Sequence, residues 1–303
     1  MDEASVRDQL YGRRVAVTAT PRSPGAPGAL GGRYHVRERI GAGATAAVYR
    51  ARDARLRRDV AVKLLAERLA DDPAWLRRFR REAELAGRLA HPNVAAIFDA
   101  GSRPRPYIVA ELVHGRDVAT LLDAGRPIST TDALDLVLQV CEALGHAHRH
   151  GVLHGDVTPR NVVVEEREGI AKLVDFGVAV DLLGRRKPTK PRGTPGYLAP
   201  ELLRGGAPSV RSDLYSLGVL AYRLLGGPPP FPRPEQEETA PWPPAMTTPP
   251  SRPPLRSELP PPLTAVVERA MASRPDARPA SVTDFRRELL AARGGPRRLR
   301  AAA

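Results

Sequence analysis

Two short stretches of the chain carry carboxylate and amide side chains where they could bind a metal ion. Asp156 and Asn161 lie five residues apart in LHGDVTPRNVVV, between an apolar helical pattern and a β-branched run, and Asp175 follows an apolar run in LVDFG. Mg²⁺ in proteins takes one or two carboxylates and completes its octahedral shell with phosphate oxygens and water. Brought together between short strands, these three side chains predict a site for Mg²⁺ that carries phosphate.

The same stretches resemble the catalytic loop and the metal-binding triplet of eukaryotic-type Ser/Thr protein kinases, in the form found in bacteria. The resemblance implies that ATP and Mg²⁺ are the cofactors, with Mn²⁺ as an alternative ion, and that Asn161 and Asp175 hold the metal. It implies that Asp156 accepts or orients the substrate hydroxyl. The expected activity is phosphoryl transfer to Ser or Thr of protein substrates.

The catalytic loop departs from the family pattern HRDxKPxN at two positions. It reads HGDVTPRN, with Gly155 in place of Arg and Thr158 in place of Lys. In many relatives the arginine is neutralised by a phosphate on the activation loop, so we expect activity that does not need this phosphate. Loss of one preorganised donor costs roughly 10²–10³ in rate, so we expect slow catalysis. Arg160 stands where receptor tyrosine kinases carry an arginine, and the resemblance implies partial compensation.

A glycine-bearing turn between two predicted strands precedes this region. YHVRERIGAGATAAVYRARD reads as an alternating strand, a turn and a second strand, and RDVAVKLL as a third. Gly41 and Gly43 would let backbone N–H groups approach phosphate. The turn resembles the kinase glycine-rich loop, whose third glycine is here Ala46. The resemblance implies that the nucleotide is bound by Ile40, Gly41, Ala42, Gly43, Val48, Ala61, Lys63, Glu111, Val113 and Val163.

Lys63 is unusual in a chain that has 43 arginines and four lysines. A lysine at the end of an apolar strand therefore indicates a need for a compact point charge. The resemblance implies that Lys63 contacts the nucleotide phosphates and pairs with Glu82, nineteen residues later, on the helical pattern AWLRRFRREAELAGRLA that begins after Asp72. Glu84 is the alternative partner.

The remaining periodicity predicts an α+β chain with two lobes. Two further strands, in HPNVAAIFDA and RPYIVAELV, complete a five-stranded antiparallel sheet, and four long amphipathic patterns predict a mainly helical second lobe. The resemblance implies a bilobal protein kinase-like fold. We expect a flexible leader at 1–32, a kinase domain at 33–293 with an N-lobe at 33–110 and a C-lobe at 114–293, and a basic tail at 294–303.

Several structural contacts are also implied by the resemblance. His154 would be buried beneath the metal-binding triplet, Asp213 would anchor the catalytic loop, and Glu201 would pair with Arg278.

RGTPGYLAPELL resembles the protein-kinase segment that forms the peptide platform, where Thr194 contacts the catalytic aspartate. This segment separates the chain from small-molecule phosphotransferases, which share the HGD pattern and are the third functional hypothesis. A nucleotide-binding pseudokinase that acts as a scaffold or regulator is the second.

Composition and charge restrict the other function classes. No run approaches eighteen apolar residues, so a soluble cytoplasmic protein without a transmembrane segment is expected. The net charge of +13 would suit nucleic acid or anionic lipid. Because no nucleic-acid module accompanies it, we favour a solvated arginine-rich surface and expect no specific nucleic-acid partner.

Two irregular segments leave their roles open. Fifteen of the 35 residues at 228–262 are proline, in the region where the family places a substrate-docking helix; this segment is either a ligand for a proline-recognising partner or a surface insertion. The basic stretch GVAVDLLGRRKPTKPRG resembles an activation loop. Thr189 and Thr194 are candidate autophosphorylation positions there, and a merely solvated basic loop is the alternative.

Overall fold

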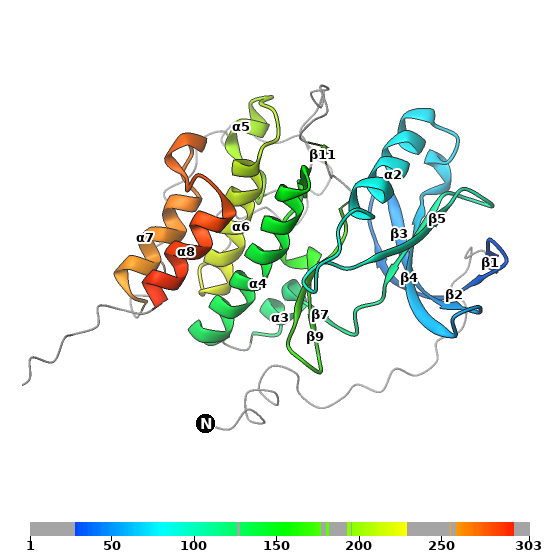
Figure 1. Cartoon of the computed structure of the whole chain (residues 1–303), viewed down its shortest axis with the longest axis horizontal. Helices are drawn as coiled ribbons and strands as arrows, with labels where there is room; N and C mark the ends of the chain where they lie inside the picture. The colour runs from blue at the N-terminus through cyan, green and yellow to red at the C-terminus, as the bar shows by residue number, and fades with distance from the viewer. Residues whose placement is uncertain are drawn as a thin grey trace, which may run out of the picture.

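The computed structural model describes residues 28–125, 128–176, 180–181, 193–194, 196–228, 255 and 259–293. The chain divides into a sheet-rich part that contains the helix α2 and a helical part that contains α4, α6, α7 and α8 (Figure 1). Among the helices in these ranges, none is both long and apolar enough to cross a membrane. Thr189, the tail at 294–303 and most of the proline-rich segment lie outside the described residues.

The sheet of the first part has six antiparallel strands in the order β1-β2-β3-β4-β6-β5. This is one strand more than the sequence pattern predicts, because Ala29 and Leu30 pair with His35 and Tyr34 at the sheet edge. Two residues are too few to show a period of two. The strands are β1 (Ala29–Leu30), β2 (Tyr34–Ala42), β3 (Ala46–Asp53), β4 (Arg58–Leu65), β5 (Ile97–Gly101) and β6 (Tyr107–Glu111).

Helix α2 (Pro73–Ala86) lies against this sheet after the short helix η1 (Glu67–Leu69). It begins where the sequence predicts, since the Asp72 carboxylate accepts the N–H groups of Ala74 and Trp75 and caps the helix. Its apolar stripe packs through Phe79 on Leu65 and Ile108 of the sheet. This packing orients the face of α2 that carries Phe79 toward β4 and β6.

The helical part is built around α6 (Val210–Leu224), which is buried on almost every side. Its residues lack the polar face of a surface helix, and α4 (Thr130–Arg149) and α7 (Pro261–Ala270) pack directly against it. The remaining elements are β7 (Gly115–Asp117), α3 (Val118–Asp123), β8 (Val152–Leu153), η2 (Pro159–Asn161), β9 (Val162–Glu165), β10 (Ala171–Leu173), β11 (Val180–Asp181), α5 (Pro200–Leu203), η4 (Pro275–Ala277) and α8 (Val282–Arg293).

Two short sheets support the loops between the parts. Strands β10, β9 and β7 form one sheet in that order, and β8 pairs with β11 in another. Because η2 lies between β8 and β9, the loop that contains it is held at both ends by paired backbone. The segment after β10 leaves the sheet next to this loop, through a hydrogen bond from Val174 N–H to the Asn161 carbonyl of 2.9 Å.

The structural ion pair expected between Glu201 and Arg278 is confirmed. Two N–H groups of Arg278 each lie 2.7 Å from a carboxylate oxygen of Glu201, and the guanidinium also donates to the carbonyls of Ala272 and Arg211. Arg278 is only 3% exposed. It therefore joins α5, the start of α6 and the α7–α8 connection at one buried point.

Candidate active site

A cavity of about 780 Å³ lies between the two parts of the molecule. Its walls come from β2, β3, β4 and α2 on one side, and from the segments around η2 and after β10 on the other. The following residues predicted from the sequence line it: Ile40, Gly41, Ala42, Gly43, Val48, Lys63, Glu82, Val113, Asp156, Arg160, Asn161, Val163 and Asp175.

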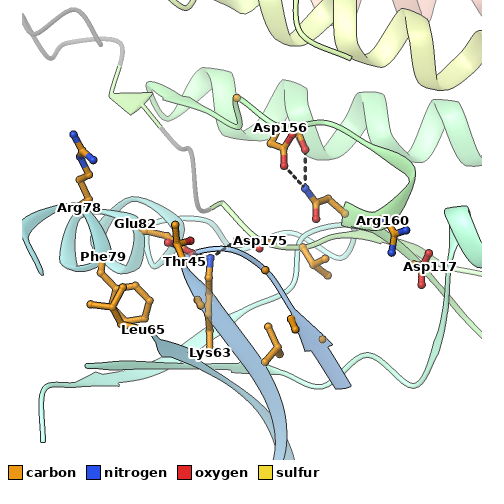
Figure 2. A pocket seen from close by; sticks show the side chains of 18 of the residues that line it. Thr45, Lys63, Leu65, Arg78, Phe79, Glu82, Asp117, Asp156, Arg160 and Asp175 are labelled. Carbon is orange, nitrogen blue, oxygen red and sulfur yellow. Dashed lines mark hydrogen bonds and ion pairs between the residues drawn. The ribbon is translucent and has the colours of Figure 1, made fainter. Parts of the chain in front are cut away.

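Lys63 lies between two carboxylates in this cavity. Its Nζ atom is 2.6 Å from Glu82 Oε1 and 2.5 Å from Asp175 Oδ1, and Figure 2 shows the three side chains converging from β4, α2 and the segment after β10. Glu84, the alternative partner, instead faces solvent and pairs with Arg81 at 3.3 Å. The ammonium thus connects the helix to the candidate metal-binding aspartate.

The charges of this triad are mutually dependent. Burial alone would lower the pKa of the Lys63 ammonium, but the Asp175 and Glu82 carboxylates raise it above its ordinary value, so the lysine stays charged. Burial also raises the pKa of the Glu82 carboxyl, while Lys63 opposes that effect and Asp175 adds to it. Two carboxylates therefore share one ammonium.

Asp175 reaches the cavity because its backbone is in the left-handed region, with φ of 58°. The next side chain, Phe176, is buried against the His154 ring, with 4.6 Å between the ring centroids. A ring nitrogen of His154 lies 3.1 Å from the Val174 carbonyl. The expected burial of His154 beneath the triplet is confirmed, and it holds the backbone turn that presents the carboxylate.

Asp156 and Asn161 are bonded to each other. The Asn161 Nδ2 group donates to the Asp156 carbonyl at 2.8 Å and to Asp156 Oδ2 at 3.0 Å. Thr194 reaches the same aspartate, but through its backbone N–H, which donates to Asp156 Oδ1 at 2.8 Å. Each carboxylate oxygen of Asp156 therefore has a fixed donor, which orients the group in the cavity (Figure 2).

Asp213 of α6 anchors the loop that carries Asp156, as expected. The buried Asp213 carboxylate accepts the backbone N–H groups of His154 and Gly155 at 2.9 and 2.8 Å, and a ring nitrogen of His148 lies 2.8 Å away. Burial alone would raise the pKa of Asp213, but these partners hold it below its usual range.

The residues present fit Mg²⁺ and a nucleotide. Since the Nδ2 group of Asn161 donates to Asp156, its Oδ1 atom is the one left for a metal, and Asp175 is a 39% exposed carboxylate in the same cavity. A Cβ atom at Gly41 or Gly43 would meet protein atoms only at 3.6 and 3.7 Å. Packing therefore does not require glycine there, whereas close approach of phosphate to the backbone does.

Four predicted residues lie differently from what their proposed roles suggest. Ala61, Glu111 and Thr194 are not among the residues that line the cavity. The Glu111 side chain pairs with Lys172 at 3.0 Å and accepts the Ala96 N–H, and its backbone N–H donates to the Ala96 carbonyl at 2.8 Å, so neither its carboxylate nor its N–H is directed to an adenine. Arg160 is exposed and, in Figure 2, extends toward Asp117 instead of Asp156.

The cavity also has lining residues that the sequence analysis did not assign to it. Trp75 and Arg78 extend it along α2, and Asp117 and Gly155 border the catalytic loop. The α2 residues gave no signal, because arginines on a helix are ordinarily interpreted as solvent-facing. Leu112, which follows β6, also lines the cavity, as expected for the connection between the lobes beside Val113.

Comparisons with known proteins agree with this architecture. Residues 34–288 match the family model described as "Protein kinase domain". The chain is 37% identical over 281 residues to the serine/threonine-protein kinase PknB of Mycolicibacterium smegmatis, covering 87% of this chain and 43% of that protein. It is 37% identical over 286 residues to a probable serine/threonine-protein kinase of Streptomyces coelicolor, covering 89% and 41%.

A solved structure extends the similarity to three dimensions. The crystal structure of the Mycobacterium tuberculosis PknI kinase domain has a TM-score of 0.69 at 31% identity, covering 89% of this chain and 99% of that chain. This chain spans about two fifths of the length of the curated relatives it matches. On its sequence match, its fold and the composition of its cavity, the chain belongs to the protein kinase family, among the bacterial Ser/Thr kinases of eukaryotic-like (Hanks) type.

Proposed function

We propose that this chain transfers the γ-phosphoryl group of ATP to Ser or Thr hydroxyls of protein substrates. One observation carries the proposal: Lys63 contacts both Glu82 and Asp175 in the cavity that also contains the bonded pair Asp156 and Asn161. The lysine–glutamate pair and the metal-binding aspartate must both be in position for protein kinases to act. Here both are in position.

Each residue has a separate task in the proposed reaction. Asn161 and Asp175 would hold Mg²⁺, which when bound neutralises charge on the phosphates. Lys63 would bind phosphate oxygens while Glu82 keeps it in position. Asp156, oriented by the Asn161 amide and the Thr194 N–H, would accept a hydrogen bond from the substrate hydroxyl and take its proton.

We further propose that transfer is slow. Thr158, at the position of the family lysine, is 2% exposed, so its short side chain supplies no cation to the cavity. Arg160 is close in sequence, yet it would have to turn away from Asp117 to reach a transferring phosphate. A loss of one preorganised cation amounts to roughly 10²–10³ in rate. Arg160 would recover part of this when substrate is bound.

Gly155 supports independence from activation-loop phosphorylation. Glycine offers no cation next to Asp156, so no buried positive charge there requires a phosphate to neutralise it. Activity of a phosphatase-treated sample should therefore equal that of the untreated protein. A complete loss of activity after phosphatase treatment would contradict this part of the proposal.

A nucleotide-binding pseudokinase is the second candidate. The buried Thr158 and the orientation of Arg160 favour it, because Thr158 carries no charge and Arg160 extends toward Asp117 instead of Asp156. In that case the ordered triad of Lys63, Glu82 and Asp175 would serve nucleotide binding alone.

Incubation with Mg²⁺ and labelled ATP, followed by mass spectrometry, tests these alternatives. We expect phosphate on Ser or Thr, with Thr189 and Thr194 as the first sites to inspect, and its loss in Asp156→Asn. Arg160→Ala should transfer more slowly than the native protein. No incorporation, with ATP and Mg²⁺ still raising the melting temperature, would refute the kinase proposal in favour of the pseudokinase.

A further inference from the structure

Helix α2 carries a group of arginines that the proposed transfer reaction does not use. They are Arg77, Arg78, Arg80 and Arg81, and the first turn of the helix holds no acidic residue. Only two of the four, Arg78 and Arg81, line the cavity.

Arg78 is an exposed residue of α2 that stacks on an aromatic ring. Its guanidinium carbon lies 5.0 Å from the centroid of the Trp75 ring, and Trp75 lines the same cavity. Stacking on an aromatic face restrains a guanidinium but leaves the N–H groups on its edge able to donate. Within the part of the chain that the structure describes, no carboxylate forms an ion pair with Arg78, whereas Arg81 pairs with Glu84 at 3.3 Å.

The carboxylates of the cavity already have other partners. Glu82 and Asp175 contact Lys63, Asp156 accepts hydrogen bonds from Asn161 and Thr194, and Asp117 caps α3 by accepting the Thr120 N–H at 2.9 Å. The wall contributed by α5 and the segment after it is uncharged and includes two glycines: Leu202, Gly205, Gly206 and Pro208. An anion entering between this wall and α2 would thus meet Arg78 without meeting an unpaired carboxylate from the described residues.

We propose that Arg78, positioned by Trp75, binds an aspartate or glutamate side chain of the protein substrate near the Ser or Thr that accepts phosphate. Figure 2 shows Arg78 extending from α2 away from Lys63, toward the half of the molecule that carries Asp156. Both residues line one cavity, so a peptide presented to Asp156 has a continuous path to Arg78. The planar fork of a guanidinium matches a carboxylate with two parallel hydrogen bonds. This inference rests on the proposed kinase function and specifies its substrate class.

The test uses the full chain and a set of Ser peptides in which one Asp is moved through the positions flanking the Ser, each paired with an Asn peptide of the same shape. We expect the native protein to have a KM about 3- to 5-fold lower for the best Asp peptide than for its Asn partner, the range of a well-formed exposed ion pair. Arg78→Glu should abolish or reverse this preference in KM.

Arg77→Glu is the matched control, because it makes the same charge change on the adjacent residue of α2 but does not lie in the cavity lining. It should keep the preference for the Asp peptide. An equal loss in both variants would mean that only general positive charge attracts the peptide, and would overturn the proposal. Melting temperatures of both variants would establish that they fold, and Arg78→Gln would replace Arg78→Glu if the latter does not.

Binding of the same peptides, labelled with fluorescein and followed by anisotropy, separates this proposal from the kinase proposal. A preference for Asp that depends on Arg78, in a protein that transfers no phosphate, would support the anionic site and refute catalysis. Phosphate transfer without any Asp preference would support the kinase proposal and refute the anionic site at Arg78. The absence of a preference in both assays would overturn the assignment of Arg78.

Discussion

The backbone angle of Gly155 restricts which residues the catalytic loop can accommodate at this position. Its φ is 78°, in the left-handed region, and its N–H is fixed by the buried Asp213. Glycine adopts this conformation without strain, whereas most side chains do so at a cost of roughly 1–2 kcal/mol. Glycine at this position therefore supplies no charge and carries no backbone strain.

Restoring arginine should accordingly destabilise the protein. We expect Gly155→Arg to lower the free energy of unfolding by about 1 kcal/mol, because the left-handed backbone must be kept while a side chain is added. Gly155→Asn is the control, since asparagine tolerates this region better and should lose less. Urea denaturation of the three proteins measures the difference, and an Arg variant as stable as the native protein would show that the loop relaxes out of this angle.

At the residue scale, the sequence was informative where chemistry restricts the choice of side chain. Lys63 could be singled out because the chain otherwise uses arginine, and the spacing implied by the family resemblance selected Glu82, which the structure brings to 2.6 Å. The direction of Arg160 could not be predicted, because it extends toward Asp117, whose position is set by β7 and by the start of α3. Trp75 and Arg78 were missed for a similar reason: their proximity to the cavity is a property of how α2 packs.

At the scale of elements, the buried pair of Arg278 and Glu201 joins segments that local periodicity could not bring together. The residues are 77 positions apart, and their contact depends on α5, α6 and the α7–α8 connection reaching one point. Long amphipathic helices were predictable because each has its own apolar stripe. Strand β1 was not, since two residues acquire a strand conformation only from their neighbour β2.

Removing this pair should be costly. We expect Arg278→Ala to lower the free energy of unfolding by about 3–5 kcal/mol, because Glu201 would be left as an uncompensated, largely buried charge. Arg274→Ala is the matched control. Arg274 also pairs with a carboxylate, that of Asp276, but it is 80% exposed, so its loss should be close to neutral. Equal effects in urea denaturation would show that the buried pair has no special role.

For the whole molecule, acid stability depends in part on a contact at the end of the β2–β3 pair of the large sheet. Arg33 donates two hydrogen bonds to Asp53, at 2.8 and 2.7 Å, and this hydrogen bonding lowers the pKa of the Asp53 carboxyl to about 2. A depressed carboxyl pKa stabilises the folded state above the unfolded value, about 3.9, and the contribution is lost as the pH falls toward the folded value.

We therefore expect Asp53→Asn to be less stable than the native protein at neutral pH, with the difference shrinking as the pH falls from about 4 toward 2. Chemical denaturation at a series of pH values measures this. Glu67→Gln, which removes a highly exposed carboxylate, should change little over the same range. A constant difference between the native protein and Asp53→Asn at every pH would contradict the assignment of the pKa shift to Asp53.

Helix α2 presents Arg78 and Glu82 one helical turn apart, so the two residues move as one rigid unit. A nucleotide bound to Lys63 would favour the position of α2 in which Glu82 contacts that lysine. A substrate carboxylate bound to Arg78 would act on the same helix. Both ligands would then favour one position of α2. Linkage requires that any gain in peptide affinity produced by ATP be matched by an equal gain in ATP affinity produced by the peptide. An acidic substrate would in this way act as a positive heterotropic effector of its own phosphate donor.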